Sequence, residues 1–139
     1  MIKKLTFIVT ALAVVFITGC GSNSNNGTDG GDNKTKHKIA YVTNGIDPFW
    51  DLCAAGVRQA ESELGGVECE IHFPTKGLAD QKSIMESLMA KGISGIAVSP
   101  VDADGQTKFL NEIASQTKLI THDADAPKSD RLVYIGTDN

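Results

Sequence analysis

From Lys38 onward, short apolar runs alternate with longer stretches in which apolar residues recur every three or four positions. The short runs are typical of buried strands, and the longer stretches are typical of amphipathic helices. Strands that alternate with helices form a parallel sheet. Because crossover connections are right-handed, we expect a doubly wound α/β fold with strand order 2-1-3-4-5. The expected strands are Ile39–Thr43, Val67–Phe73, Gly95–Ser99, Lys118–Thr121 and Leu132–Ile135.

Three helices are expected between these strands. The first covers Pro48–Leu64 and ends at Gly65-Gly66, because glycine favours the left-handed conformation at a helix end. The second follows a cap at Asp80 and ends at Gly92, and the third covers about Ala103–Gln116. The residues expected to face inward are Trp50, Cys53, Val57, Ala60, Leu64, Ile84, Met85, Leu88, Met89, Phe109, Leu110, Ile113 and Ala114.

The amino-terminal segment resembles a bacterial lipoprotein signal. Lys3 and Lys4 precede the apolar run Leu5–Ile17, which is too short to cross a bilayer as a stable helix. The run closes on Thr18-Gly19-Cys20, which is similar to the lipobox, where signal peptidase cleaves before a cysteine that then carries lipid. The resemblance implies a signal peptide over residues 1–19 and a membrane contact through lipid on Cys20. A secretory signal cleaved at a small-residue site is the alternative.

Residues 20–37 are rich in Asn, Gly, Ser, Asp, Thr and Lys. Such a composition buries too little apolar surface to offset the entropy of ordering, so we expect a flexible tether. The tether would connect the lipid to a globular domain over residues 38–139. The expected location is therefore the cell envelope, with the domain exported and anchored on its periplasmic or cell-surface face.

Charge and cysteine content exclude several classes. The net charge is −4, and no basic patch is interleaved with aromatic residues, so we expect no nucleic-acid partner. Cys53 lies early in a helix and Cys69 early in the next strand, so we expect both to be free thiols. No Cys-x-x-Cys motif or Cys/His cluster is present, and we expect no metal site and no cofactor.

The loop Asn44–Trp50 follows the first strand, and ligands of open parallel sheets bind beside such strand ends. It offers a carboxylate, Asp47, and two large rings, Phe49 and Trp50. Rings suit the C–H face of a sugar, and a carboxylate accepts hydrogen bonds from hydroxyl groups. The same residues allow a structural interpretation, in which Asp47 is the N-cap, Pro48 follows it, and the rings belong to the buried face of the helix.

A second polar loop, His122–Pro127, follows the fourth strand and should share the same sheet edge. Asp123 lies directly at the strand end, where no helix requires a cap, which favours a role in binding. For His122 we expect a polar residue at the rim rather than a catalytic base.

Four stretches together resemble the type 1 periplasmic sugar-binding proteins, the ribose-binding-like solute receptors of ABC transporters. The similar residues are Pro48-Phe49-Trp50, Ala90–Pro100, Ile120–Asp123 and Val133–Asn139. The resemblance covers essentially all of Lys38–Asn139 and implies the amino-terminal lobe of such a receptor. Members of the family cross a hinge into a second lobe after a motif like Thr137-Asp138-Asn139, so we expect a truncated chain or a fragment.

The resemblance also implies roles for individual residues. Asp47 and Asp123 would accept hydrogen bonds from sugar hydroxyls, and Phe49 and Trp50 would stack on the sugar. Ribose binders follow the second carboxylate with an Arg, whereas Ala124 stands here, so ribose itself is not expected. In the same two loops, Asn44 and Asp125 complete the candidate set.

The expected function is that of a carbohydrate-binding receptor that delivers a monosaccharide or small polyol to an ABC permease. A sensory lipoprotein that presents a ligand to a membrane receptor is the alternative. No catalytic residue is expected, because no G-x-S-x-G, Walker A or G-x-G-x-x-G motif follows a strand.

Overall fold

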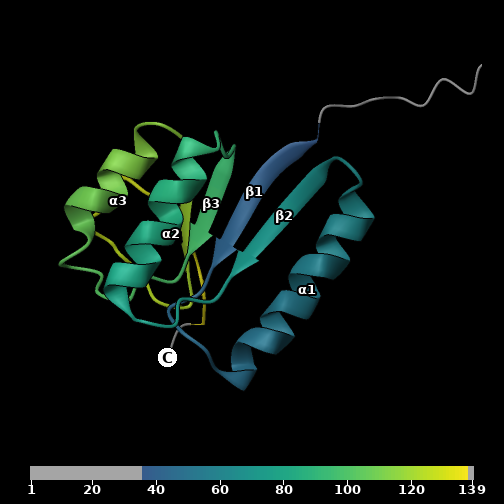
Figure 1. Ribbon diagram of the computed structural model, residues 1–139, viewed down its shortest axis with the longest axis horizontal. Coiled ribbons are helices and arrows are strands. Elements are labelled where there is room, and N and C mark those ends of the chain that lie inside the picture. Colours follow the sequence, from purple (N-terminus) through teal and green to yellow (C-terminus); the bar gives the residue numbers. More distant parts are fainter. Residues whose placement is uncertain (1–35, 138–139) are drawn as a thin grey trace, which may run out of the picture. The chain divides into compact units, whose positions relative to one another are not determined.

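The computed structural model describes residues 36–137 (Figure 1). Its five strands form one parallel sheet in the order β2-β1-β3-β4-β5, which confirms the predicted fold class and strand order. The elements in chain order are β1 (His37–Val42), α1 (Pro48–Leu64), β2 (Val67–His72), α2 (Leu78–Ala90), β3 (Gly95–Val98), α3 (Thr107–Ala114), β4 (Lys118–His122) and β5 (Tyr134–Ile135).

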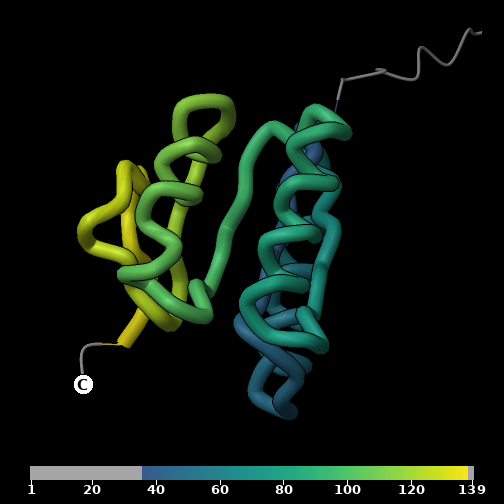
Figure 2. Tube along the Cα trace, turned by 60° about the vertical axis from the view of Figure 1, so that its left-hand side comes forward, coloured from purple at the N-terminus to yellow at the C-terminus, as the bar shows by residue number. Residues whose placement is uncertain are grey.

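The register aligns the carboxyl ends of the central strands. Val42 of β1 lies opposite Val98 of β3, and Val98 lies opposite Thr121 of β4. The loops that follow β1, β3 and β4 therefore leave the sheet at one edge. Beyond β4, the chain continues beside α3 (Figure 2), where the Asp130 N–H donates to Asn111 Oδ1 at 2.7 Å.

Helix α1 has the predicted bounds. Asp47 is its N-cap, and Asp47 Oδ1 accepts a hydrogen bond from the Phe49 N–H at 2.8 Å. Pro48 occupies the first helical position, where its missing N–H removes no helical hydrogen bond. The helix ends at Gly65, which adopts a φ of 65°.

The predicted starts of the other helices are wrong. Helix α2 begins at Leu78, before Asp80, and the Asp80 carboxylate instead accepts hydrogen bonds from the N–H groups of Thr75 and Lys76, at 2.6 and 3.3 Å. Helix α3 begins at Thr107, because the preceding residues form a separate turn. In that turn Asp102 Oδ1 accepts from the Gly105 N–H at 3.0 Å.

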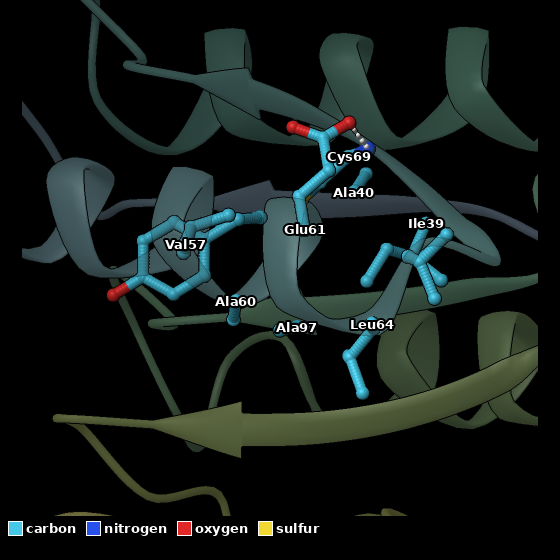
Figure 3. Close-up of a pocket in the computed structure, with 10 residues that line it drawn as sticks. Ile39, Ala40, Val57, Ala60, Glu61, Leu64, Cys69 and Ala97 are labelled. Atoms are coloured by element: carbon cyan, nitrogen blue, oxygen red, sulfur yellow. Dashed lines mark hydrogen bonds between the residues drawn. The ribbon is translucent and has the colours of Figure 1, made fainter.

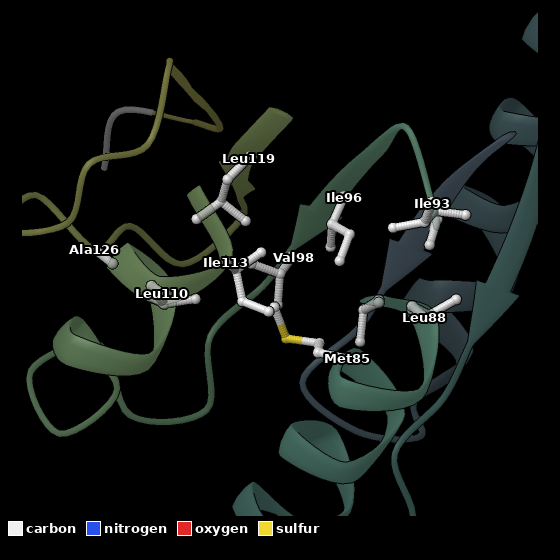
Figure 4. Close-up of a cluster of buried hydrophobic side chains, with 11 residues drawn as sticks. Met85, Leu88, Ile93, Ile96, Val98, Leu110, Ile113, Leu119 and Ala126 are labelled. Atoms are coloured by element: carbon white, nitrogen blue, oxygen red, sulfur yellow. The ribbon is translucent and has the colours of Figure 1, made fainter. Parts of the chain in front are cut away.

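One face of the sheet packs against α2 and α3 (Figure 4). Alternate strand residues point toward this face, as the two-residue period of a strand requires. Of the predicted inward residues, Met85, Leu88, Leu110 and Ile113 are buried there, and Ile84, Met89, Phe109 and Ala114 are partly buried against them. The strand residues of this core are Ala40, Val42, Ile96, Val98 and Leu119.

Helix α1 lies against the opposite face and leaves an apolar groove of about 150 Å³ beside it (Figure 3). Its walls include Ile39 of β1 and Ala97 of β3, with Val57, Ala60 and Leu64 of α1. The prediction that Ala60 and Leu64 are buried is wrong, since both are exposed. The apolar stripe of the helix faces this groove instead of a packed core.

The predicted signal peptide, the lipid acceptor Cys20 and the tether as far as residue 35 lie outside the described residues. Within residues 36–137, no helix is long and apolar enough to cross a membrane. Cys53 is half-buried and Cys69 buried, and both are free thiols.

Candidate ligand-binding site

The loops at the carboxyl edge of the sheet are joined by hydrogen bonds. The Ser99 N–H donates to the Val42 carbonyl at 2.9 Å, which continues the β1–β3 ladder one residue beyond β3. Ser99 Oγ donates to Asp123 Oδ2 at 3.2 Å. The first, third and fourth strands therefore bring their following segments together, as the sheet order predicts.

The two rings of the first loop have different environments. The Phe49 side chain is 48% exposed, whereas Trp50 is only 3% exposed. The Trp50 ring meets Phe49 edge-on with centroids 4.9 Å apart, and meets His122 edge-on at 5.6 Å. Phe49 is therefore available to a ligand, and Trp50 supports it from beneath. The structural interpretation thus holds for Trp50, whereas stacking of Phe49 on a ligand stays a prediction.

His122 is buried, so the expectation of a polar residue at the rim is wrong. Its ring stacks on Tyr41 with centroids 4.1 Å apart and planes 15° from parallel. Only 7% of the residue is exposed, and His122 Nε2 has no hydrogen-bond partner among the described residues. Burial lowers the pKa of His122 to about 4, so its ring is neutral at pH 7. The neutral His122 ring is therefore packed in the interior, against Tyr41 and Trp50, rather than exposed at a rim.

Asn44 and Asp47 are exposed residues of the loop between β1 and α1. The Asp47 carboxylate uses Oδ1 for the helix cap, which confirms the structural interpretation of this residue. A carboxylate has a second oxygen and further lone pairs. The cap therefore leaves acceptor capacity on the side chain, and ligand binding by Asn44 and Asp47 stays a prediction.

Asp123 is exposed at the end of β4 and has an unusual backbone conformation. Its φ of 59° lies in the left-handed region, which non-glycine residues adopt rarely and Asp tolerates better than most. The conformation is held on both sides: the Asp123 N–H donates to the Ile135 carbonyl at 3.1 Å, and the Tyr134 hydroxyl donates to the Asp123 carbonyl at 2.8 Å. The structure thereby presents the carboxylate at the sheet edge.

Asp125 is paired with an arginine from later in the same loop. Arg131 Nη2 donates to Asp125 Oδ2 at 2.8 Å, Arg131 Nε donates to Oδ1, and Thr121 Oγ1 also donates to Oδ1 at 2.9 Å. The Arg131 guanidinium holds the pKa of the Asp125 carboxyl below its usual value. Most of the hydrogen-bond acceptor capacity of Asp125 is thus used within the loop. A ligand would have to bind to the lone pairs that Arg131 and Thr121 leave free.

Gln81 was not among the predicted site residues, yet its side chain contacts the backbone at the ends of two strands. Its side chain is fully buried in α2 and donates to the Thr43 and Ser99 carbonyls, at the ends of β1 and β3. A signal was present: Gln81 stands four residues before the inward-facing Met85, so it belongs to the buried stripe of α2. A polar residue in a buried stripe needs hydrogen-bond partners, and here they are the strand ends.

The exposed part of this edge combines an aromatic face with carboxylate and amide oxygens. Among residues 36–137 no cluster of three or more His, Cys, Asp or Glu side chains could hold a metal ion. The arrangement suits a neutral ligand with an apolar face and several hydroxyl groups.

Comparison with known proteins agrees with this chemistry. Residues 39–139 match the family described as periplasmic binding protein domain, so the chain belongs to that family. A comparison with curated protein sequences finds no match. Members of this family are non-enzymatic receptors, which confirms the prediction that the chain is not an enzyme, and the family implies a location outside the cytoplasm.

Solved structures give the same result. An ABC transporter solute-binding protein from Burkholderia graminis C4D1M, in complex with D-arabinose, is 28% identical and superposes with a TM-score of 0.71, over 77% of this chain and 37% of that one. GanP, a glucose-galactose binding protein from Geobacillus stearothermophilus, is 27% identical with a TM-score of 0.68, over 74% of this chain and 38% of that one.

A third structure, the XylFII–LytSN complex, is also 27% identical with a TM-score of 0.68, over 74% of this chain and 38% of the matched chain. The chain thus spans 37–38% of the length of these three relatives. These matches, each partial in the relative, confirm the resemblance to one lobe of a sugar-binding solute receptor.

Proposed function

We propose that the carboxyl edge of the sheet binds a monosaccharide or a similar polyol, and that the chain acts as solute receptor for a sugar ABC transporter. The observation that carries the proposal is the presence of an exposed ring, Phe49 in the first turn of α1, and an exposed carboxylate, Asp123 directly after β4, at the same edge of the sheet. The two segments are in contact through Trp50 of α1 and His122 of β4, whose ring centroids are 5.6 Å apart.

The ring and the carboxylate have complementary tasks. Phe49 would cover the apolar face of the sugar, and Asp123 and Asp47 would accept hydrogen bonds from its hydroxyl groups. Relatives that bind D-arabinose and glucose or galactose support a monosaccharide of this kind. The partner that takes the sugar onward would be an ABC permease in the membrane.

Replacing Phe49 by alanine should weaken sugar binding by about 1–3 kcal/mol, because the stacked ring is lost. Saturation-transfer NMR on D-arabinose and D-galactose would measure this, since it detects weak complexes. Leu52→Ala is the matched control, because Leu52 is another apolar side chain of α1, 76% exposed. Equal sugar signals for Phe49→Ala and wild type would contradict the stacking role.

Asp123→Asn is a second variant that should fold. Asparagine tolerates the left-handed conformation and can still accept from Ser99 Oγ, but it lacks the negative charge. Hydrogen bonds to charged groups contribute more than neutral ones, so the sugar signal should decrease here too.

A sensory role is the second candidate. It is favoured by one relative, the XylFII–LytSN complex, in which a protein of similar fold is bound to another protein. The binding site would be the same in both roles, so the partner decides between them. Crosslinking in the native membrane should join the chain to a permease in the first case and to a receptor protein in the second.

The lipid anchor on Cys20 belongs to the same proposal, because a receptor tethered to the membrane stays near its permease. Cys20→Ser should abolish incorporation of labelled fatty acid, since the thiol accepts the lipid. Cys53→Ser is the matched control and should leave incorporation unchanged. Undiminished incorporation in Cys20→Ser would show that the segment is not a lipoprotein signal.

A further inference from the structure

The buried amide of Gln81 makes four hydrogen bonds. Its Nε2 donates to the Thr43 carbonyl at 2.8 Å and to the Ser99 carbonyl at 2.7 Å. Its Oε1 accepts from the Val101 N–H at 3.3 Å and from Gln106 Nε2 at 2.9 Å. The reverse orientation of the amide would set its nitrogen against two donors, so the four contacts fix its orientation.

The network continues through Gln106, which is 3% exposed. Gln106 Oε1 accepts from the Asp102 N–H at 2.9 Å, so the second amide holds the loop that leads from β3 toward α3. Thr43, the residue before the candidate Asn44, and Ser99, whose hydroxyl donates to Asp123, are both fully buried. One side chain of α2 thus contacts the segment after β1, which leads to the candidate residues Asn44 and Asp47, and the segment after β3, which supports Asp123 through Ser99.

The Gln81 amide binds the two strands at the point where their direct pairing ends. The β1–β3 ladder continues as far as the Ser99 N–H and the Val42 carbonyl. The Gln81 amide binds the next carbonyls, those of Thr43 and Ser99, where the two segments turn into their loops. An apolar residue at this position would fill the same space and would leave both carbonyls buried without a partner, which is unfavourable.

We propose that Gln81 is a positioning residue of the candidate site: its amide sets the distance between the loop after β1, with Phe49, and the loop after β3, which supports Asp123. The inference deepens the proposed function and rests on it for its consequence in binding. The geometric part concerns the loops themselves and is tested without any sugar.

The test compares three variants of the full chain by hydrogen exchange and mass spectrometry, each measured against its own exchange in the core strand β1. Gln81→Met keeps an unbranched side chain of similar length and removes all four hydrogen bonds. Exchange in residues 43–50 and 99–106 should rise by roughly tenfold relative to β1, as for the loss of a hydrogen bond of ordinary strength.

Two matched variants separate positioning from a general loss of stability. Leu88→Ala removes a buried core residue of the same helix, 1% exposed, and should raise exchange throughout without a specific effect on the loops. Gln106→Met leaves the bonds from Gln81 to Thr43 and Ser99 in place, so it should loosen residues 99–106 and leave 43–50 unchanged.

The inference is overturned if Gln81→Met affects residues 43–50 no more than Leu88→Ala does. If Gln81→Met does not fold, Gln106→Met decides: equal loosening of both loops, or of neither, would overturn it. Sugar binding is a separate readout. Wild type that binds no sugar would refute the proposed function, and the loop exchange would still test the role of Gln81.

Discussion

Replacing Trp50 by alanine should lower the free energy of unfolding by about 3–5 kcal/mol, the usual range for removing a large buried aromatic side chain. The ring is 3% exposed and meets three other rings, Tyr41, Phe49 and His122, with centroids 6.4, 4.9 and 5.6 Å away. Its loss would leave a cavity between the first turn of α1 and the ends of β1 and β4. Urea unfolding followed by circular dichroism would measure the change.

Leu52→Ala is the control for this experiment. Leu52 lies on the same helix but is 76% exposed, so its truncation should alter stability by no more than about 0.5 kcal/mol. A Trp50→Ala variant as stable as Leu52→Ala would contradict the conclusion that the Trp50 ring stabilises the core.

Acidification should destabilise the chain through His122. Burial lowers the pKa of this residue from 6.5 to about 4, so between these pH values the unfolded state binds a proton that the folded state does not. Stability is therefore complete above pH 6.5 and falls as the pH decreases. The expected loss is about 3 kcal/mol by pH 4, of which about 2 kcal/mol appears by pH 5.

His122→Phe is the matched variant, because it keeps a ring stacked on Tyr41 and cannot be protonated. The carboxyl groups with lowered pKa values lose their contributions mainly below pH 5, since their ordinary values are 3.8 for Asp80 and Asp125 and 4.5 for Glu61 and Glu70. Urea unfolding between pH 7 and pH 5 thus isolates the histidine. The same pH slope in His122→Phe and wild type would contradict the assignment.

The first four strands could be predicted from sequence because each is a short apolar run next to a clear helix signal. The fifth follows a polar loop, and it is shorter than predicted, Tyr134–Ile135 instead of Leu132–Ile135. Helix α1 has strong end signals, Asp47-Pro48 and Gly65, and its bounds were correct. The predicted start of α2 is wrong because Asp80 is not the helix cap. Its side chain instead accepts a hydrogen bond from the preceding loop. Ala60 and Leu64 have the period of a buried stripe, but periodicity does not reveal whether anything covers that stripe.

The loops of the candidate site could be predicted from topology, since parallel strands end at one edge. Whether each side chain there is buried, exposed or hydrogen-bonded could not be predicted from topology. The burial of His122 depends on Tyr41, a residue far away in sequence, and the engagement of Asp125 depends on Arg131. Separating Phe49 from Trp50 required the packing of α1 on the sheet, because adjacent helical residues point in different directions.

The most direct test of the central claim is an NMR titration of the ¹⁵N-labelled chain with D-arabinose and D-galactose. We expect saturable shift changes in the amides of residues 44–50 and 122–125, because these two segments hold the candidate binding residues. Shift changes confined to the groove lined by Ile39, Val57 and Leu64, or no saturable change at all, would contradict a sugar site at the carboxyl edge of the sheet.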